Sequence, residues 1–204
     1  MAKNVFISFR YKDGIQYKNR LASMFDSFYD TVDYSEDQDR SMMSDSTIQR
    51  YLYSKLRRSS VTIVILTPLA VNHQKSWNGY YNDWIYDEIR YSLEDRENNG
   101  TNGLIAVYTP EAKEMLISDG TDGSIYVNQF DNLCCRNMMN VKPEYKINPN
   151  PDFYNRDYDS YCSLISWNEF IGNIGQYINI ARKKRDEQYK YNTETSHTGN
   201  GCEP

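Results

Sequence analysis

The sequence predicts an α/β fold built on a central parallel sheet. Three short apolar runs without polar alternation, at 4–8, 60–67 and 103–109, are typical of strands that helices cover on both faces. Segments with apolar residues at helical spacing separate these runs along the chain. Together these observations favour a flavodoxin-like three-layer sandwich, because alternating strands and helices build layers of this kind.

The chain is expected to form one domain over 1–190, because 204 residues suffice for a substantial core but are few for two. A loop-rich insertion is expected at about 118–160, where glycine, proline and asparagine interrupt the patterns. The polar stretch 191–204 is expected to be a disordered tail. In chain order we expect strands at 4–8, 31–34, 60–67, 103–109 and 124–130, and helices at 15–29, from 47 onward, and at 82–97, 111–117 and 166–189.

Composition and charge argue against several classes of function. The formal net charge is −5 and the only basic run is 182–185, which is unlike a nucleic-acid-binding surface. No apolar run approaches the roughly 18 residues of a membrane span, and no signal peptide precedes the first strand. The four cysteines lack zinc-site spacing, and there are only two histidines. We therefore expect a cytoplasmic protein with reduced thiols, no metal, and no membrane or nucleic-acid partner.

The first strand-to-helix loop is a candidate binding loop by topology. Ligands of parallel α/β sheets sit beyond the carboxyl ends of the strands, and residues 10–14 follow the first strand. The segment around it reads NVFISFRYKDG, and its residues 5–10 and Asp13 resemble the opening strand and loop of Toll/interleukin-1 receptor (TIR) domains. From the residues alone, Asp13 is expected to cap the helix that follows.

The helix expected at 82–97 carries a carboxylate beside its apolar stripe. The stripe consists of Ile85, Ile89 and Leu93. Glu88 lies at the margin of this stripe, with Trp84 one turn before it on the same flank. A carboxylate in such a place can have a modified pKa, which makes Glu88 a candidate active-site residue. The alternative is an ordinary amphipathic helix in which Glu88 pairs with an arginine nearby, such as Arg90.

A second resemblance involves the same helix. Its segment WIYDEI is similar to the W-(V/I)-x-x-E-I helix of TIR-like proteins, particularly the bacterial group that includes the Thoeris antiviral TIR proteins (ThsB). The matching residues are Trp84, Ile85, Glu88 and Ile89. The two landmarks follow one another in the family's order, and the resemblance covers residues 3–107. It implies a TIR-like fold for this part of the chain.

The resemblance also implies an activity. In the NAD-cleaving members of the family the glutamate is the catalytic residue, which assigns that role to Glu88. NAD is then the substrate, and neither a cofactor nor a metal is needed. The product would be an ADP-ribose-derived, cyclic signal that reaches a partner effector protein. Self-association would complete the site. The loop at 35–45 corresponds to the loop that reaches a neighbouring subunit in TIR domains, but it is polar and acidic and departs from the Gly- or Pro-containing loops of many receptor TIRs, which argues against a receptor-style adaptor role.

The remaining site residues follow from the same resemblance. Phe9 and Arg10 match the positions that hold the dinucleotide, and Tyr11 is a stacking partner. Arg10 would meet a phosphate through two donors, although a solvated loop residue is an equal alternative. Asp33 is expected near the ribose. Trp84 either stacks beneath the nicotinamide or packs in the core.

Two other classes of function compete with an NAD-cleaving enzyme. One is a catalytically inactive TIR-like module that binds protein partners. The other is a different flavodoxin-like enzyme acting on nucleosides or nucleotides. A receiver domain fits poorly, because no pair of acidic residues follows the first strand.

Overall fold

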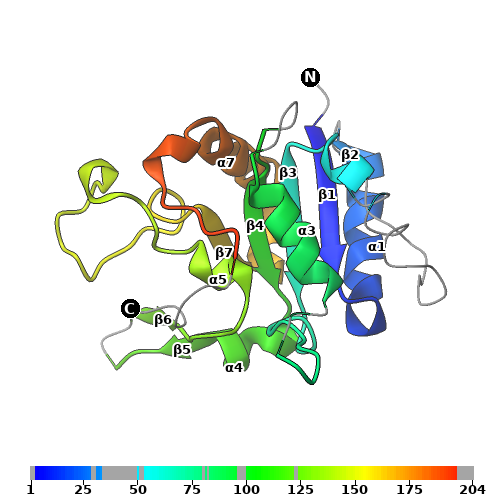
Figure 1. Ribbon diagram of the computed structural model, residues 1–204, viewed down its shortest axis with the longest axis horizontal. Coiled ribbons are helices and arrows are strands. Elements are labelled where there is room, and N and C mark those ends of the chain that lie inside the picture. Colours follow the sequence, from blue (N-terminus) through cyan, green and yellow to red (C-terminus); the bar gives the residue numbers. More distant parts are fainter. Residues whose placement is uncertain are drawn as a thin grey trace.

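The structure is a computed structural model that describes residues 3–28, 31–33, 50, 53–79, 81, 83–95, 100–121 and 124–196 (Figure 1). Its centre is a sheet of five parallel strands in the order β2-β1-β3-β4-β7, which confirms the predicted α/β sandwich. The strands of the sheet are β1 (Lys3–Phe9), β2 (Thr31–Asp33), β3 (Val61–Leu66), β4 (Gly103–Tyr108) and β7 (Cys162–Ser166). A separate antiparallel hairpin consists of β5 (Ile117–Asp119) and β6 (Ile125–Val127).

The helices lie on both faces of the sheet (Figure 1). The longer helices are α1 (Tyr11–Phe28), α3 (Trp84–Leu93), α6 (Trp167–Gly172) and α7 (Ile174–Asp186). The short helices are α4 (Lys113–Leu116) and α5 (Leu133–Arg136), together with the 3-10 turns η1 (Pro110–Ala112), η2 (Pro143–Tyr145) and η3 (Gln188–Lys190). Among the described residues, every helix is too short or too polar to cross a lipid bilayer.

Strand periodicity sorts the core into two layers. Alternate residues of β4 pack to opposite sides: Leu104 joins a cluster with α3 and α5, and Ile105 joins one with α1, α6 and α7. On β1, Val5 packs on the α1 side, while Phe6 packs on the α3 side against Tyr91. Every side chain of β3 is buried, as expected for the central strand of a doubly covered sheet.

The last strand and the final helix differ from the prediction. A single helix was expected over 166–189, but the chain first forms β7 at the sheet edge and then two helices that break at Asn173. The apolar residues of β7 are separated by serines, and Ile165 also fits the helical stripe that follows it. Only the ladder with β4 distinguishes the strand, and such a long-range contact leaves no local pattern.

The region expected to be a loop-rich insertion contributes partly to the core. Leu133, Cys134 and Met138 are buried with residues of α3 and β4. The chain beyond η3 also stays on the domain: Tyr191 is buried, and Glu194 exchanges hydrogen bonds with Asn137 at 2.9 and 3.0 Å. The expected disordered tail is therefore wrong for 191–196, while 197–204 lie outside the described residues.

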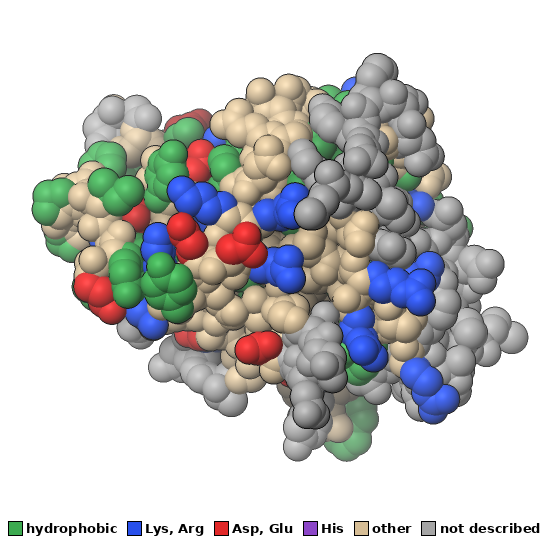
Figure 2. All heavy atoms as spheres, turned by 90° about the horizontal axis from the view of Figure 1, so that it is seen from above, with side chains coloured by type: hydrophobic (Ala, Val, Ile, Leu, Met, Phe, Trp, Pro, Cys, Tyr) green, Lys and Arg blue, Asp and Glu red, His purple; other side chains and the backbone are tan. Residues whose placement is uncertain are grey.

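The segment around η2 extends sideways from the sheet (Figure 1). Figure 2 views the molecule from above, and hydrophobic side chains gather there at the end that this segment occupies. The exposed apolar residues of the segment are Tyr145, Ile147, Phe153, Tyr154 and Tyr158. This surface lies away from the carboxyl ends of the strands, where α4 and the β3–α3 connection lie in Figure 1.

The packing of β4 against α7 depends on a glycine. A Cβ atom added at Gly103 would lie 2.2 Å from the carbonyl oxygen of Ala181, so only glycine allows the two backbones to approach this closely. Of the cysteines expected to be reduced, Cys134 and Cys162 are free and buried. The polar loop at 35–45 lies outside the described residues.

Candidate functional site

The connection between β1 and α1 is tighter than predicted. A turn was expected over 10–14, but α1 begins at Tyr11 and leaves Arg10 as the only linking residue. The Gly14 amide donates to the Arg10 carbonyl at 2.7 Å, which starts the helical ladder at once. A Cβ at Gly14 would lie 3.3 Å from the Cβ of Phe9. Glycine thus lets the last residue of β1 pack against the first turn of the helix, a tertiary contact that outweighs its low helix propensity.

Asp13 does not cap α1, in contrast to the expectation. It lies inside the first turn, where a carboxylate favours the positive end of the helix dipole. Its Oδ2 accepts a hydrogen bond from the backbone amide of Leu69 at 3.0 Å. Asp13 therefore ties the start of α1 to the loop that leaves β3.

Helix α3 begins at a true cap, Asp83. Its side chain accepts a hydrogen bond from the amide of Ile85 at 3.4 Å, and its backbone is extended, as is usual at this position. The side chain of Asp83 is 1% exposed, so it is also the most buried carboxylate at this end of the helix. The helix runs for ten residues, to Leu93, which is shorter than the predicted 82–97.

Glu88 lies in the middle of α3 and is 9% exposed. It is part of the buried face of the helix, rather than at its margin as expected, and that face comprises Ile85, Glu88, Ile89, Tyr91, Ser92 and Leu93. Arg90, the partner considered for Glu88, pairs instead with Asp87 at 3.3 Å and Glu94 at 3.7 Å. Arg90 is thus engaged with these two carboxylates.

The flank of α3 that carries Glu88 faces β1. Trp84, one turn earlier, is half-buried and packs on the cluster that includes Phe6 of β1 and Tyr91. Ser8 is two residues after Phe6 and therefore lies on the same face of the strand. The Ser8 hydroxyl is buried and has no hydrogen-bond partner among the described residues. A buried hydroxyl without a partner is unusual in a folded protein.

One serine hydroxyl and one threonine hydroxyl hold α3 against β3. The Ser92 hydroxyl donates to the Glu88 carbonyl at 2.8 Å and lies 2.7 Å from the hydroxyl of Thr62. Asn102 donates to the same Thr62 oxygen at 3.2 Å. This buried polar network fixes the part of α3 that follows Glu88 relative to the central strand.

Arg10 joins the end of β1 to the start of α3. Its Nη2 donates to Asp83 Oδ1 at 2.7 Å, and the Arg10 side chain is 18% exposed. His73, from the β3–α3 loop, contacts the other carboxylate oxygen of Asp83 through Nδ1 at 2.9 Å. Burial raises the pKa of the Asp83 carboxyl, but the His73 hydrogen bond and the charge of Arg10 outweigh burial. The pKa of Asp83 therefore lies below its ordinary value.

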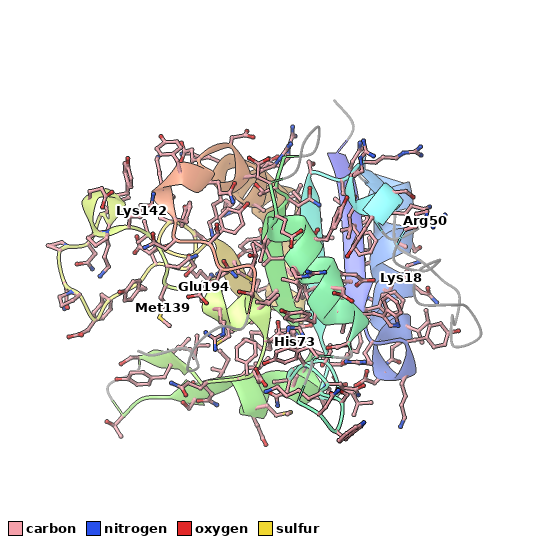
Figure 3. The ribbon with its side chains drawn as sticks, in the orientation of Figure 1. Lys18, Arg50, His73, Met139, Lys142 and Glu194 are labelled. Carbon is pink, nitrogen blue, oxygen red and sulfur yellow. The ribbon has the colours of Figure 1, made fainter. Side chains whose placement is uncertain are left out.

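The tautomer of His73 follows from its second partner. The amide of Leu133 donates to His73 Nε2 at 3.0 Å, so this nitrogen carries the lone pair. Nδ1 then carries the hydrogen and donates it to Asp83. The imidazole is wholly enclosed, with the rings of Tyr81 and Tyr86 edge-on at 5.7 and 5.2 Å between centroids. Figure 3 labels His73 at the end of the sheet where α3 begins.

The structure brings most of the predicted site residues to one end of the sheet. Phe9 ends β1 and packs on the α1 side of the sheet, while Arg10 follows it and contacts the start of α3. Tyr11 is 46% exposed, with its ring centroid 6.5 Å from that of Phe9. Asp33 is different, because its backbone pairs with Val5. That position is four residues before Phe9, roughly 13 Å along the strand. The side chain of Asp33 lies outside the described residues.

Sequence reasoning missed two residues of this arrangement, Asp83 and His73. An aspartate just before an apolar helical stripe is a recognisable cap signal, and it could have identified Asp83. His73 offers no comparable signal, because its partners are distant: Asp83 is ten residues away and Leu133 sixty. Only the folded chain brings them together.

The parallel sheet, and the junction of its first strand with helix α3, define the chain as an α/β protein with a TIR-like domain. The family model described as Thoeris protein ThsB, TIR-like domain, matches residues 6–114, and the chain belongs to this family. It is thus a TIR protein of a defence system. The matched residues include β1 from Phe6 onward, β3, α3 and β4, whereas α5, β7 and α7 lie beyond them.

Proposed function

We propose that this protein cleaves NAD at the bond between nicotinamide and ribose. The observation that supports this most strongly is Glu88, a buried carboxylate on the face of α3 that is turned toward β1. Membership of the ThsB family agrees with a reaction on NAD. Arg10, at the end of β1 and beside the α3 cap, supplies a cation at the end of the sheet where α/β proteins bind ligands.

The chemistry needs few groups. As the nicotinamide–ribose bond breaks, nicotinamide leaves as a neutral molecule with the bonding electron pair, and positive charge develops on the ribose, as in glycoside hydrolysis. The Glu88 carboxylate stabilises this charge and orients a ribose hydroxyl. A preorganised charge in a site that excludes water is often the largest single contribution to catalysis. Nicotinamide is already cationic in NAD, so no general acid is required.

The other side chains bind the substrate in this proposal. Arg10 holds a phosphate, Phe9 and Tyr11 contact the dinucleotide, and Trp84 lies beside the nicotinamide. Trp84 also packs against Phe6, so its two expected roles are compatible. Asp33, at the end of β2, is proposed to lie near the ribose.

We further propose that the reaction serves signalling in the cytoplasm. An ADP-ribose-derived product, cyclic in the simplest form, would diffuse to an effector protein and activate it. Self-association of the chain would complete the site. These proposals rest on the family alone, and chromatographic identification of the product tests the first of them.

The decisive experiment compares two glutamates of the same helix. Wild-type protein, Glu88→Gln and Glu94→Gln are incubated with NAD, with and without lysate from phage-infected cells, and released nicotinamide is measured. Glu88→Gln is expected to lose about 10²- to 10³-fold in rate, the usual cost of removing a preorganised charge. Glu94→Gln is the matched control and should retain the activity, because Glu94 pairs with Arg90 at the far end of α3. Equal rates for the two variants would refute the role of Glu88.

An inactive interaction module is the competing function. If wild-type protein releases no nicotinamide with the infected-cell lysate, yet elutes as a stable complex with another protein, the interaction module is the better description. The same outcome would contradict the proposal of NAD cleavage.

A further inference from the structure

The segment 130–133 holds the β3–α3 loop in place through hydrogen bonds. This segment lies beyond the residues that the family model matches. The amide of His73 donates to the Asp131 carbonyl at 2.7 Å, and the Asp131 amide donates to the side chain of Asn72 at 2.8 Å. Asn132 donates to the carbonyls of Ala70 and Val71, each at 3.2 Å. These bonds hold the backbone on both sides of His73.

The same segment also sets the orientation of the His73 ring. The Leu133 amide donates to Nε2, so Nδ1 points its hydrogen at Asp83 Oδ2. His73 and Asp83 are almost fully enclosed, with side-chain exposures of 0% and 1%. A contiguous chain of hydrogen bonds therefore runs from Leu133 through His73 and Asp83 to Arg10, and only Arg10 reaches solvent.

The two oxygens of the Asp83 carboxylate accept hydrogen bonds from different donors. Oδ2 accepts from His73 and from the Gln74 amide at 3.4 Å, while Oδ1 accepts from Arg10 and from the Ile85 amide. The donors on Oδ2 prevent the carboxylate from turning. The hydrogen bonds from His73 and Gln74 also offset part of the negative charge of the Asp83 carboxylate. Asp83 therefore neutralises the guanidinium of Arg10 less completely, and Arg10 keeps more attraction for an anion.

We propose that His73 is a positioning residue for NAD binding: it fixes Asp83, which in turn presents Arg10 to a phosphate of the dinucleotide. This inference rests on the proposed function, and it extends the site to the backbone amide of Leu133, which lies beyond the residues that the family model matches. His73 does not touch the substrate. His73 affects the affinity for NAD, because it determines how Asp83 orients the Arg10 side chain.

Two amide substitutions separate the two hydrogen bonds of His73. The Asn side-chain amide stands near the place of Nδ1, so His73→Asn keeps a donor for Asp83 and loses the acceptor for Leu133. The longer Gln amide stands near the place of Nε2, so His73→Gln keeps the bond to Leu133 and loses the one to Asp83. Both variants lose the same ring contacts with Tyr81 and Tyr86.

The experiment measures NAD affinity by calorimetry in a Glu88→Gln background, where turnover does not interfere, together with the melting temperature. His73→Ala and His73→Gln are expected to weaken NAD binding about tenfold, as for one misplaced charge-assisted contact. His73→Asn is expected to recover most of that loss. Asp131→Asn is the control: it breaks the ion pair with Lys75 at 2.7 Å, and so weakens the same junction without touching Asp83.

The outcomes are distinguishable. Equal NAD affinity for His73→Asn and His73→Gln, with similar losses in melting temperature, would mean that His73 only stabilises the fold. A loss of affinity in Asp131→Asn equal to that in His73→Gln would have the same meaning. If wild-type protein releases no nicotinamide and the Glu88→Gln parent does not bind NAD, the proposed function fails and this inference fails with it. Nicotinamide release by wild-type protein combined with unchanged affinity in His73→Gln would overturn the positioning role alone.

Discussion

The two faces of the sheet are built from different kinds of side chain. The α3 face buries polar groups among its apolar residues, including Glu88, Ser92, Asp83, His73 and Asn132. The opposite face, under α1, α6 and α7, carries a large cluster of aliphatic and aromatic side chains, and its helices also bury Lys18 and Lys184. Burying polar groups costs free energy unless each one finds a partner, so an apolar face stabilises more per residue. The apolar face therefore supplies stability, and the polar face can accommodate a site.

The largest effect on stability is expected on the apolar face. Phe170 is fully buried there, with its ring 6.1 Å from that of Tyr177. Phe170→Ala should reduce the free energy of unfolding by about 3–5 kcal/mol, because it removes a large buried side chain and leaves a cavity. Urea unfolding measures this change. The NAD-cleaving rate of the remaining folded protein should stay close to that of wild type.

Phe153→Ala is the matched control, since Phe153 is 62% exposed in the segment after η2. Its effect should be within about 0.5 kcal/mol. Similar losses for the two phenylalanines would contradict the assignment of stability to the apolar face.

A buried lysine at the edge of the apolar face gives the second effect. Lys184 of α7 is almost fully buried, and its Nζ donates to the Ser163 hydroxyl at 2.6 Å and to the Arg156 carbonyl at 2.8 Å. Burial, the main cause, lowers the pKa of Lys184 from 10.5 to about 8. At a pH between about 8 and 10.5, Lys184 is protonated in the unfolded chain and mostly neutral in the folded one, so the unfolded chain binds more protons. Stability should therefore rise with pH above about 8, and this gain is lost as pH falls through about 8.

Chemical unfolding between pH 7.5 and pH 9.5 measures the slope. The Lys184 contribution is expected to be roughly 1–2 kcal/mol over this interval. Lys184→Met removes this titrating group and should abolish the rise. The curve of the variant should then fall with pH, because burial raises the pKa of the Cys134 thiol above its ordinary value. The upper limit avoids the tyrosines, because burial raises the pKa of Tyr161, for example, to about 12, and its contribution is lost only as pH rises above about 10. A slope that is the same in Lys184→Met would contradict the depressed pKa.

The smallest effect concerns the polar face. Ser92→Ala removes the hydroxyl that bonds to the Glu88 carbonyl and contacts Thr62, while Thr62 keeps the bond from Asn102. The expected loss is about 1 kcal/mol of unfolding free energy, the net value of a typical hydrogen bond. Ser118→Ala is the control, because its hydroxyl bonds to Asn128 on the exposed hairpin. If the polar face holds the site, Ser92→Ala should lower the NAD-cleaving rate more than Phe170→Ala does. The opposite order would contradict the assignment of the site to the polar face.

The parts of the fold that could be predicted are those with a local pattern. The strands β1, β3 and β4 are continuous apolar runs, and each was found within about two residues of its observed bounds. Helix α3 has a regular stripe and was also found. In contrast, β7 and α5 were missed, since one is a serine-separated edge strand and the other a short turn of helix in a segment without periodicity.

The candidate site divides in the same way. Glu88 and Arg10 were recognised from the segments that contain them, and their roles in catalysis and binding stay predictions. The connection between them was not visible, because Arg10 and Asp83 are 73 residues apart in the chain. The early start of α1 was missed for a related reason: Gly14 weakens the helical pattern, and its compensating contact with Phe9 exists only in the folded protein.

The sequence by itself determined the layered architecture and the family, because apolar periodicity and short motifs are properties of neighbouring residues. The tertiary structure decided which polar groups became buried and what they contact. Those outcomes depend on segments from β1, the β3–α3 loop and the chain before α5 meeting at one end of the sheet. A buried charge is tolerated only where its partners are already in place, and no single segment contains those partners.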